Sequence, residues 1–410
     1  MVAANHLAST SRVQLRYIKE EDFGVTPTTG NALNVRMTGE SLDFALTKET
    51  DKEIRDDRQM TSSTTVNAAA TGDVKVHMQY AEYDPWFSAL LQNPWAAHGT
   101  NGVGTSFTAD FTATTITASA APTGTSAFTT LQRGQWFRLN AAGNVNNNKL
   151  FRVSSTVAPS ATVITVDAST PLAVGTAVAN VTLGGARLTN GIDMPTFTIE
   201  RAMSDVTEFM AYRGMAVSKF STSFASASLT EGTFTFMGRD MKRSEVTTLP
   251  GTPVASQGYD IQNAVTGVGN IWEGGAPLQN TYIKSMTLDI DNTLRAQDAI
   301  GNLGAVGIGV GTFSCKGSLE VYFSDGAMYD KFLNDVYTSI VVSSQDAQKN
   351  GYVFTFPRVQ LTSAKVQAGA KDTDLMASFE YEAYADINNA TPALRKTLII
   401  DRVGAAVILP

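Results

Sequence analysis

An internal repeat constrains the fold of this chain more than any other feature of its sequence. Residues 41–44 (SLDF) resemble residues 287–290 (TLDI), and residues 83–87 (YDPWF) resemble residues 329–333 (YDKFL), both at a spacing of 246 residues. Between these segments, residues 72–76 (GDVKV) resemble residues 317–321 (GSLEV). Because chance matches would not keep a common order, the pattern predicts a duplicated domain.

The later part of the repeat has a shorter spacing. Residues 197–201 (FTIER) match residues 354–358 (FTFPR) at a spacing of 157 residues, which is 89 fewer than before. This decrease in spacing is close to the length of the stretch 100–190, which contains only seven charged residues. The two observations together predict that the first copy carries an inserted domain that the second copy lacks.

The stretch 100–190 has the composition of a small all-β domain. It is rich in Thr, Ala, Ser and Gly, and runs such as 135–139 (QWFRL) and 162–166 (TVITV) are bounded by turn residues. A disordered linker is the alternative interpretation. Trp136, Phe137 and Phe151 argue against it, because disordered segments lack such residues.

Each copy has the same predicted plan. Strands at 41–47 and 73–80 precede a helix that starts at Asp84, and closing strands follow at 196–201 and 232–237. The second copy has predicted strands at 285–291, 312–323, 353–358 and 378–384, with a helix capped by Asp325 or Asp330. The predicted fold class is mainly β, a sandwich or barrel with one short helix per repeat. The predicted division is an N-terminal arm (1–34), copy one (35–99 and 191–248), the insert (100–190), a linker (249–278), copy two (279–400) and a C-terminal tail (401–410).

The composition argues against most kinds of catalytic and metal-binding site. The 410 residues include one cysteine, Cys315, and three histidines, so we expect neither a disulfide framework nor a metal site. The run 307–311 (GIGVG) precedes a strand instead of opening a helix, which is the wrong context for a phosphate-binding loop. We therefore expect no catalytic residues, no cofactor and no bound metal, and we expect the chain not to be an enzyme.

The targeting and charge signals are also weak. No apolar run is long enough for a membrane-spanning helix, and the first residues lack the apolar core of a signal peptide, so a soluble cytoplasmic product is expected. The net charge is −7 with no basic block, which argues against a surface that grips nucleic-acid phosphates.

Several segments, in this order, resemble the major tail tube protein of long-tailed, non-contractile (siphovirus-type) bacteriophages in its larger, duplicated form. The resemblance spans about residues 10–400 apart from the insert. The segments are residues 24–27 (GVTP), 40–42 (ESL), 53–58 (EIRDDR), 236–238 (FMG), 292–297 (NTLRAQ) and 325–333 (DGAMYDKFL).

The resemblance implies two tandem tail-tube-like domains that assemble, as trimeric rings with pseudo-six-fold symmetry, into a stacked hollow tube. DNA would pass through the lumen into the host without specific binding, and the partners would be the tail tip or baseplate, tape measure and tail terminator proteins. The protein would assemble in the host cytoplasm and remain in the virion tail. The insert would lie outside the tube and could contact host surface glycans.

The long loops 50–72 and 295–311 are the expected contacts between stacked rings. The candidate contact residues are Arg55, Asp56, Asp57, Arg58, Arg295 and Asp298, with Arg55 and Arg295 at matching positions. Two alternatives stay open. One is another virion or assembly protein, such as a tail terminator, a capsid decoration protein or an injection-system tube, and the other is a β-rich carbohydrate-binding or hydrolytic protein.

Overall fold

A computed structural model describes residues 8–100, 102–263, 272–277, 282–323, 326–367, 371 and 374–404. The described chain is mainly β, which confirms the predicted fold class. Its two α-helices are α1 (Asp84–Leu91) and α2 (Ala327–Leu333), and neither is long and apolar enough to cross a membrane.

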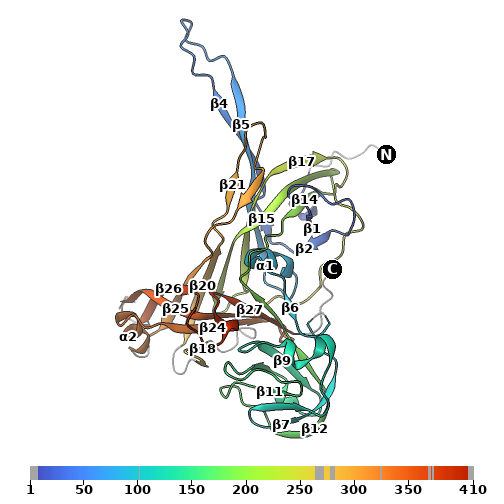
Figure 1. The fold of residues 1–410 in the computed structure, drawn as a ribbon. Helices are drawn as coiled ribbons and strands as arrows, with labels where there is room; N and C mark the ends of the chain where they lie inside the picture. The colour runs from blue at the N-terminus through green and yellow to red at the C-terminus, as the bar shows by residue number, and fades with distance from the viewer. Residues whose placement is uncertain are drawn as a thin grey trace.

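A large antiparallel sheet forms the body of the molecule (Figure 1). Eight of its strands follow one another in the order β4–β5–β16–β15–β20–β23–β26–β25. Their bounds are β4 (Asp43–Thr50), β5 (Ser63–His77), β15 (Glu208–Ala225), β16 (Glu231–Gly238), β20 (Ile283–Asp291), β23 (Ser314–Tyr322), β25 (Gly351–Gln367) and β26 (Met376–Tyr384).

The remaining strands of this sheet flank the eight. The first half of β15 pairs with β14 and β17, and β24 pairs with the first part of β25. These strands are β1 (Val13–Lys19), β2 (Leu33–Val35), β3 (Gly39–Glu40), β6 (Ala96–Ala97), β13 (Ala186–Thr189), β14 (Phe197–Met203), β17 (Asp240–Ser244), β18 (Trp272–Glu273), β19 (Ala276–Pro277), β24 (Thr338–Gln345) and β27 (Ile399–Val403).

The two halves of the sheet have the same order of strand pairing. The first half runs β4–β5–β16–β15–β14 and the second runs β20–β23–β26–β25–β24. In this order β14 corresponds to β24, and β15 corresponds to β25. The predicted match of residues 197–201 with residues 354–358 is therefore wrong, because it equates β14 with β25.

Irregularities in the ladders follow the same correspondence. The pairing of β15 with β16 skips Ser218, and the pairing of β25 with β26 skips Thr362. A skipped residue is the mark of a β-bulge, where one strand carries an extra residue. Two bulges at corresponding positions fix the alignment of β15 on β25.

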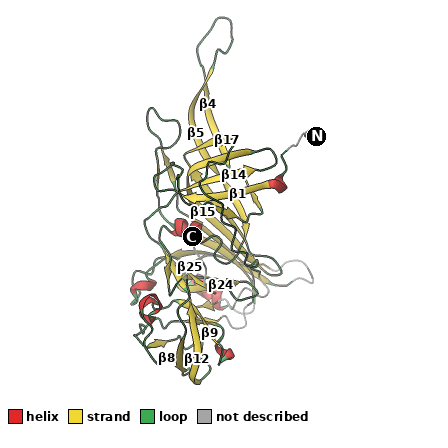
Figure 2. Ribbon diagram, turned by 90° about the vertical axis from the view of Figure 1, so that its right-hand side faces the viewer, coloured by secondary structure: helices red, strands yellow, loops and turns green. Residues whose placement is uncertain are grey.

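A separate six-stranded sheet occupies one end of the molecule (Figure 2). Its order is β10–β9–β12–β7–β8–β11, and it has its own hydrophobic cluster around Phe111, Phe137 and Phe151. The bounds are β7 (Phe107–Phe111), β8 (Thr115–Ala118), β9 (Trp136–Ala141), β10 (Leu150–Arg152), β11 (Val163–Thr165) and β12 (Gly175–Gly184). We call this unit the module. It falls inside the predicted insert, but β13 at the end of that range pairs with β6 and β27 of the large sheet.

Three other predicted segments need correction. The range assigned to an N-terminal arm contains β1, which pairs along its whole length with β14. The range assigned to a C-terminal tail begins inside β27, where Asp401 and Arg402 are buried, whereas residues 405–410 lie outside the described residues. The predicted linker contributes the buried Leu249 and Gln262, and its residues 264–271 and 278 also lie outside the description. In each case long-range pairing or burial was invisible to local sequence patterns.

The core lies between the sheet and α1. Trp86 and Phe87 of α1 are fully buried, and the Trp86 ring lies 5.2 Å from Phe234 and 5.1 Å from Phe236. Asp84 starts the helix as predicted, but Tyr83 is its N-cap residue and the Asp84 carboxylate is instead bonded to Arg402 and Tyr352. Such buried charges require partners.

The second helix is covered less completely. Its N-cap residue is Gly326, while Asp330 lies within the helix and Asp325 is outside the described residues. Met328 of this helix is buried, whereas Leu333 and the following Val336 are exposed. The single cysteine, Cys315, is buried in β23, and burial raises the pKa of its thiol.

Candidate assembly surface

The two halves of the large sheet are joined by direct strand pairing. The second half of β15 pairs with β16 on one side and with β20 on the other. Phe220 of β15 lies opposite Ile290 of β20 and both are buried, while Lys219 and Asp291 form an ion pair of 2.8 Å. The joint between the halves is therefore a continuous piece of sheet.

Each end of the eight-strand order has an open edge. Among the described strands, β4 pairs only with β5, and residues 360–367 of β25 pair only with β26. An open edge presents unpaired backbone N–H and C=O groups, which is a template for pairing with another chain.

These two open edges correspond to the two edges that meet in the internal joint. In the shared order β4 corresponds to β20, and its open edge matches the edge of β20 that faces β15. The open edge of β25 likewise matches the edge of β15 that faces β20. The open edges of β4 and β25 are therefore complementary to each other, in the same way as the edges of β20 and β15 that pair within the chain.

Exposure at the open edges agrees with this geometry. Phe44 on β4 is only half-buried, whereas its counterpart Ile290 in the internal joint is buried. Leu46 on β4 and Val366 on β25 are exposed, at 46% and 37%. Apolar side chains beside an unpaired strand edge are typical of an interface that is incomplete in the single chain.

A second candidate surface consists of two hairpins that project in the same direction (Figure 1). The first is the long β4–β5 hairpin with its loop 51–62. The second lies between β20 and β23 and contains β21 (Arg295–Gln297) paired with β22 (Gly307–Gly309). The module lies at the opposite end of the molecule from the first hairpin (Figure 2).

Four of the six predicted contact residues lie in the first loop. Arg55 and Asp57 form a surface ion pair of 2.8 Å, which raises the pKa of Arg55 and lowers the pKa of the Asp57 carboxyl. Asp56 is exposed beside them, and Arg58 has a left-handed backbone with φ of 56°. Arg55 and Asp57 are paired within their own loop, and all four side chains are exposed to solvent.

The other two candidates belong to the second hairpin. Arg295 is exposed on β21, and Asp298 accepts a hydrogen bond of 3.4 Å from Asn67 of β5. The structure therefore keeps the six residues in two groups, one at the tip of the first hairpin and one where the second hairpin rests on β5.

Two residues that the sequence analysis did not select are the most exposed apolar side chains of these loops. Ile54 and Ile300 are both fully exposed. Their spacing of 246 residues is that of the repeat, so Ile300 corresponds to Ile54. The predicted equivalence of Arg55 with Arg295 fails for the same reason. The signal available in the sequence was the recurrence of an isoleucine at the spacing of the repeat.

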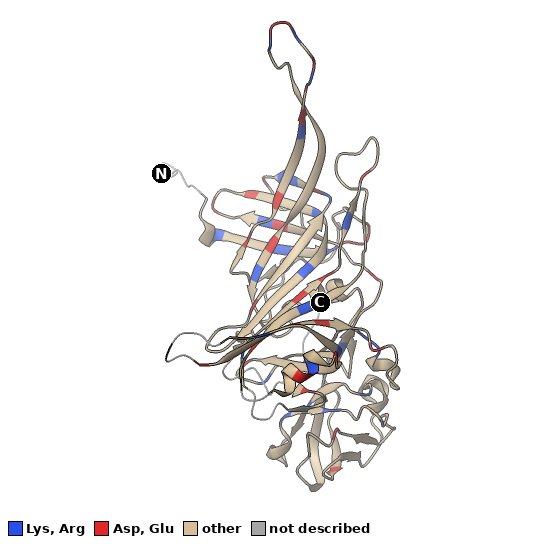
Figure 3. Ribbon diagram, turned by 90° about the vertical axis from the view of Figure 1, so that its left-hand side faces the viewer, with Lys and Arg blue, Asp and Glu red and all other residues tan. Residues whose placement is uncertain are grey.

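The polar face of the sheet carries lysines that lie beside carboxylates. Lys284 and Glu320 form an ion pair of 3.3 Å, and Lys316 lies opposite Asp289 on one side and opposite Glu382 on the other. Basic and acidic residues are interspersed along the strands (Figure 3). Within the described residues no group of three or more His, Cys, Asp or Glu side chains could hold a metal ion.

Comparison with known families identifies this architecture. The family model described as phage tail tube protein matches residues 10–383, which is most of the chain. The chain belongs to the phage tail tube protein family. A tail tube protein is a structural component of the virion tail and assembles with itself and with other tail proteins. No curated protein matches the chain significantly.

Proposed function

We propose that this tail tube protein forms trimeric rings in which β25 of one chain pairs with β4 of the next. The pairing of β15 with β20 supports this proposal, because the same contact between corresponding strands already exists within the chain. In that joint Ser221 lies opposite Asp289. The same register between two chains places Lys365 opposite Asp43 and Ala364 opposite Phe44. Ring closure would leave no open edge in the eight-strand order, which removes an aggregation hazard.

The strand count supports a trimer of a duplicated chain. Each chain contributes eight strands in one order, so three chains give about 24 strands. At about 4.8 Å between strands and a tilt of about 40°, such a barrel has a backbone diameter of roughly 48 Å. After side chains are added, the lumen remains wider than a DNA duplex.

Stacking of rings would use the projecting hairpins. A trimer presents six of them on one face, each with a fully exposed isoleucine, Ile54 or Ile300. We propose that these apolar tips enter the adjacent ring, with Arg55, Asp56, Asp57, Arg58, Arg295 and Asp298 as polar contacts around them. A head-to-tail contact of this kind does not close, and so it produces a filament.

We further propose that the polar face lines a conduit for DNA ejection. Each unpaired lysine that faced DNA would add a phosphate contact and slow its passage. The neighbouring carboxylates of Lys219 and Lys284 reduce this attraction. The net charge of −7 per chain gives a mildly repulsive tube, through which DNA passes without specific binding.

The tube would be that of a long-tailed, non-contractile phage, assembled in the host cytoplasm from the tail tip or baseplate, around tape measure protein, to a tail terminator. The module would lie outside the barrel and contact host surface glycans. The family match favours a tube over the alternatives of a terminator, a capsid decoration protein or a free carbohydrate-binding protein.

Negative-stain electron microscopy of concentrated protein, with and without tail tips as seeds, tests the assembly. We expect hollow tubes whose end-on views show a six-fold-like ring with three outer protrusions. Tubes with six protrusions would retain the tube and exclude the trimer. Monomers that persist even with seeds would contradict the proposal and favour the binding-protein alternative.

A further inference from the structure

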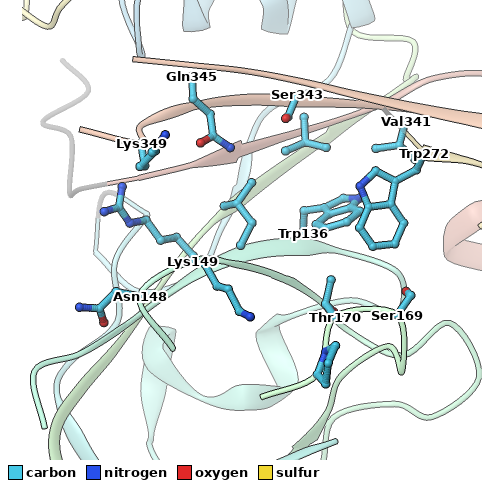
Figure 4. Close-up of a pocket in the computed structure, with 14 residues that line it drawn as sticks. Trp136, Asn148, Lys149, Ser169, Thr170, Trp272, Val341, Ser343, Gln345 and Lys349 are labelled. Carbon is cyan, nitrogen blue, oxygen red and sulfur yellow. The ribbon is translucent and has the colours of Figure 1, made fainter. Parts of the chain in front are cut away.

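A cavity of about 390 Å³ lies where the module meets the large sheet (Figure 4). One wall comes from β9, β10 and the loop at 169–171 of the module, and the other comes from β18, β24 and β25. Its volume is within the range of roughly 300 to 1,000 Å³ that is usual for ligand sites. Both walls belong to one chain, so the cavity exists without ring assembly.

The apolar end of the cavity is built from two tryptophans. The rings of Trp136 and Trp272 meet edge to face with centroids 5.2 Å apart, and both side chains are more than nine-tenths buried. The indole Nε1–H of Trp136 is buried and has no hydrogen-bond partner among the described residues. A buried donor without a partner costs free energy.

The polar end of the cavity is cationic. Its lining includes Arg138, Lys149 and Lys349 but no carboxylate, in a chain whose net charge is −7. Figure 4 shows Lys149 on the module wall and Lys349 on the facing wall. Asp346, which interacts electrostatically with Arg138, is itself buried and bonded to Asn350. Positive charge on both walls therefore favours an anionic ligand.

Neutral polar groups complete the lining. Ser169 and Thr170 lie on the module wall, and Ser343 and Gln345 lie on the wall from β24. Hydroxyl and amide side chains beside an aromatic ring are the combination that a sugar ring requires, because the sugar has an apolar C–H face and hydroxyl groups at its edge. A nucleic-acid backbone would instead need an extended basic track.

We propose that this cavity binds a saccharide unit that carries a carboxylate or phosphate group. The sugar face lies against Trp136 and Trp272, and the anionic group lies between Lys149 and Lys349. The inference deepens the glycan contact proposed for the module and is independent of ring formation.

Isothermal titration calorimetry on the full chain tests the site with trigalacturonate as the probe. We expect binding, with a change in tryptophan fluorescence, and at least ten-fold weaker binding of neutral maltotriose. The double variant Lys149→Gln/Lys349→Gln should weaken trigalacturonate binding at least ten-fold. The matched control Lys242→Gln removes an exposed lysine of β17 and should bind normally.

Three results would overturn the proposal. The first is no binding of trigalacturonate at millimolar concentration, or equal binding by the double variant. The second is full competition by inorganic phosphate at the same concentration, which indicates an adventitious ion only. The third is tighter binding of an acidic peptide. Tube formation by the same samples is scored separately, so that failure of the rings and failure of the sugar site are distinguished.

Discussion

Gly72 and Gly317 each lie against a backbone carbonyl at the same position of their hairpins. A Cβ atom at Gly72 would be 2.4 Å from the carbonyl oxygen of Ser41, and a Cβ atom at Gly317 would be 2.0 Å from that of Thr287. Ser41 and Thr287 are themselves corresponding residues of the repeat. The two halves therefore share a close approach of backbones as well as an order of strands.

Alanine at either glycine should destabilise the fold. The added methyl group would overlap a backbone oxygen that is fixed in the ladder, and overpacking of this kind costs about 1–3 kcal/mol. Urea denaturation of Gly72→Ala and Gly317→Ala measures the loss. Gly39→Ala is the matched control, because a Cβ atom there meets nothing within 4 Å. Equal stability of all three variants would contradict the close approach.

Charge reversal should test the proposed joint between chains. Asp43→Lys or Lys365→Asp alone places like charges opposite each other and should reduce tube formation strongly, whereas the double variant restores the pair and should recover it. Light scattering during seeded assembly measures this. Asp193→Lys, at an exposed site away from both open edges, should assemble normally. Failure of the double variant to recover would reject the transferred register.

The isoleucine tips should be required for stacking and not for ring closure. Ile54→Asp combined with Ile300→Asp should stop elongation, because six charged tips per ring would have to leave water. Size-exclusion chromatography with electron microscopy should then show rings or short stacks. Ile192→Asp, also at an exposed isoleucine, serves as the control. Long tubes from the double variant would remove the hairpin tips from the interface.

Acidification should loosen the attachment of the module. Burial lowers the pKa of His98 to about 4, and its Nδ1 lies 2.7 Å from Thr130 Oγ1 of the module. A pKa that is depressed in the folded state gives stability that is present above about pH 6.5 and is lost as pH falls toward 4. The loss should approach about 3 kcal/mol. Thermal unfolding of the wild type between pH 7 and 4.5, compared with His98→Gln, measures the difference.

Local sequence patterns predicted the strands and the helix that have one buried face and one exposed face. The alternation in β16 and β26 and the Asp84-Pro85 start of α1 were visible in the sequence. No strand was predicted over β15. Its first half is largely buried and shows no alternation, whereas the alternation of its second half was overlooked. For the same reason β14 was confused with β25, since both carry continuous buried runs.

The candidate surface was predicted only in outline. The two long loops were singled out as unusual segments, but residues 63–72 of the first belong to β5. The charged residues also drew attention away from Ile54 and Ile300. The open edges of β4 and β25 depend on which strands pair with which, and such pairing joins residues far apart in the sequence.

The strand β27 supplies the ion-pair partners of two buried charges that precede it in the chain. Asp401 holds Arg187 with contacts of 2.7 and 2.8 Å, and the neighbouring Arg402 holds Asp84 at the start of α1. All four side chains are buried, and two of them belong to the last described strand to leave the ribosome. Before that strand is made, Arg187 and Asp84 lack the oppositely charged partners that compensate for their burial. Closure of this part of the core therefore depends on β27, and we expect chains that lack β27 not to supply subunits to a growing polymer.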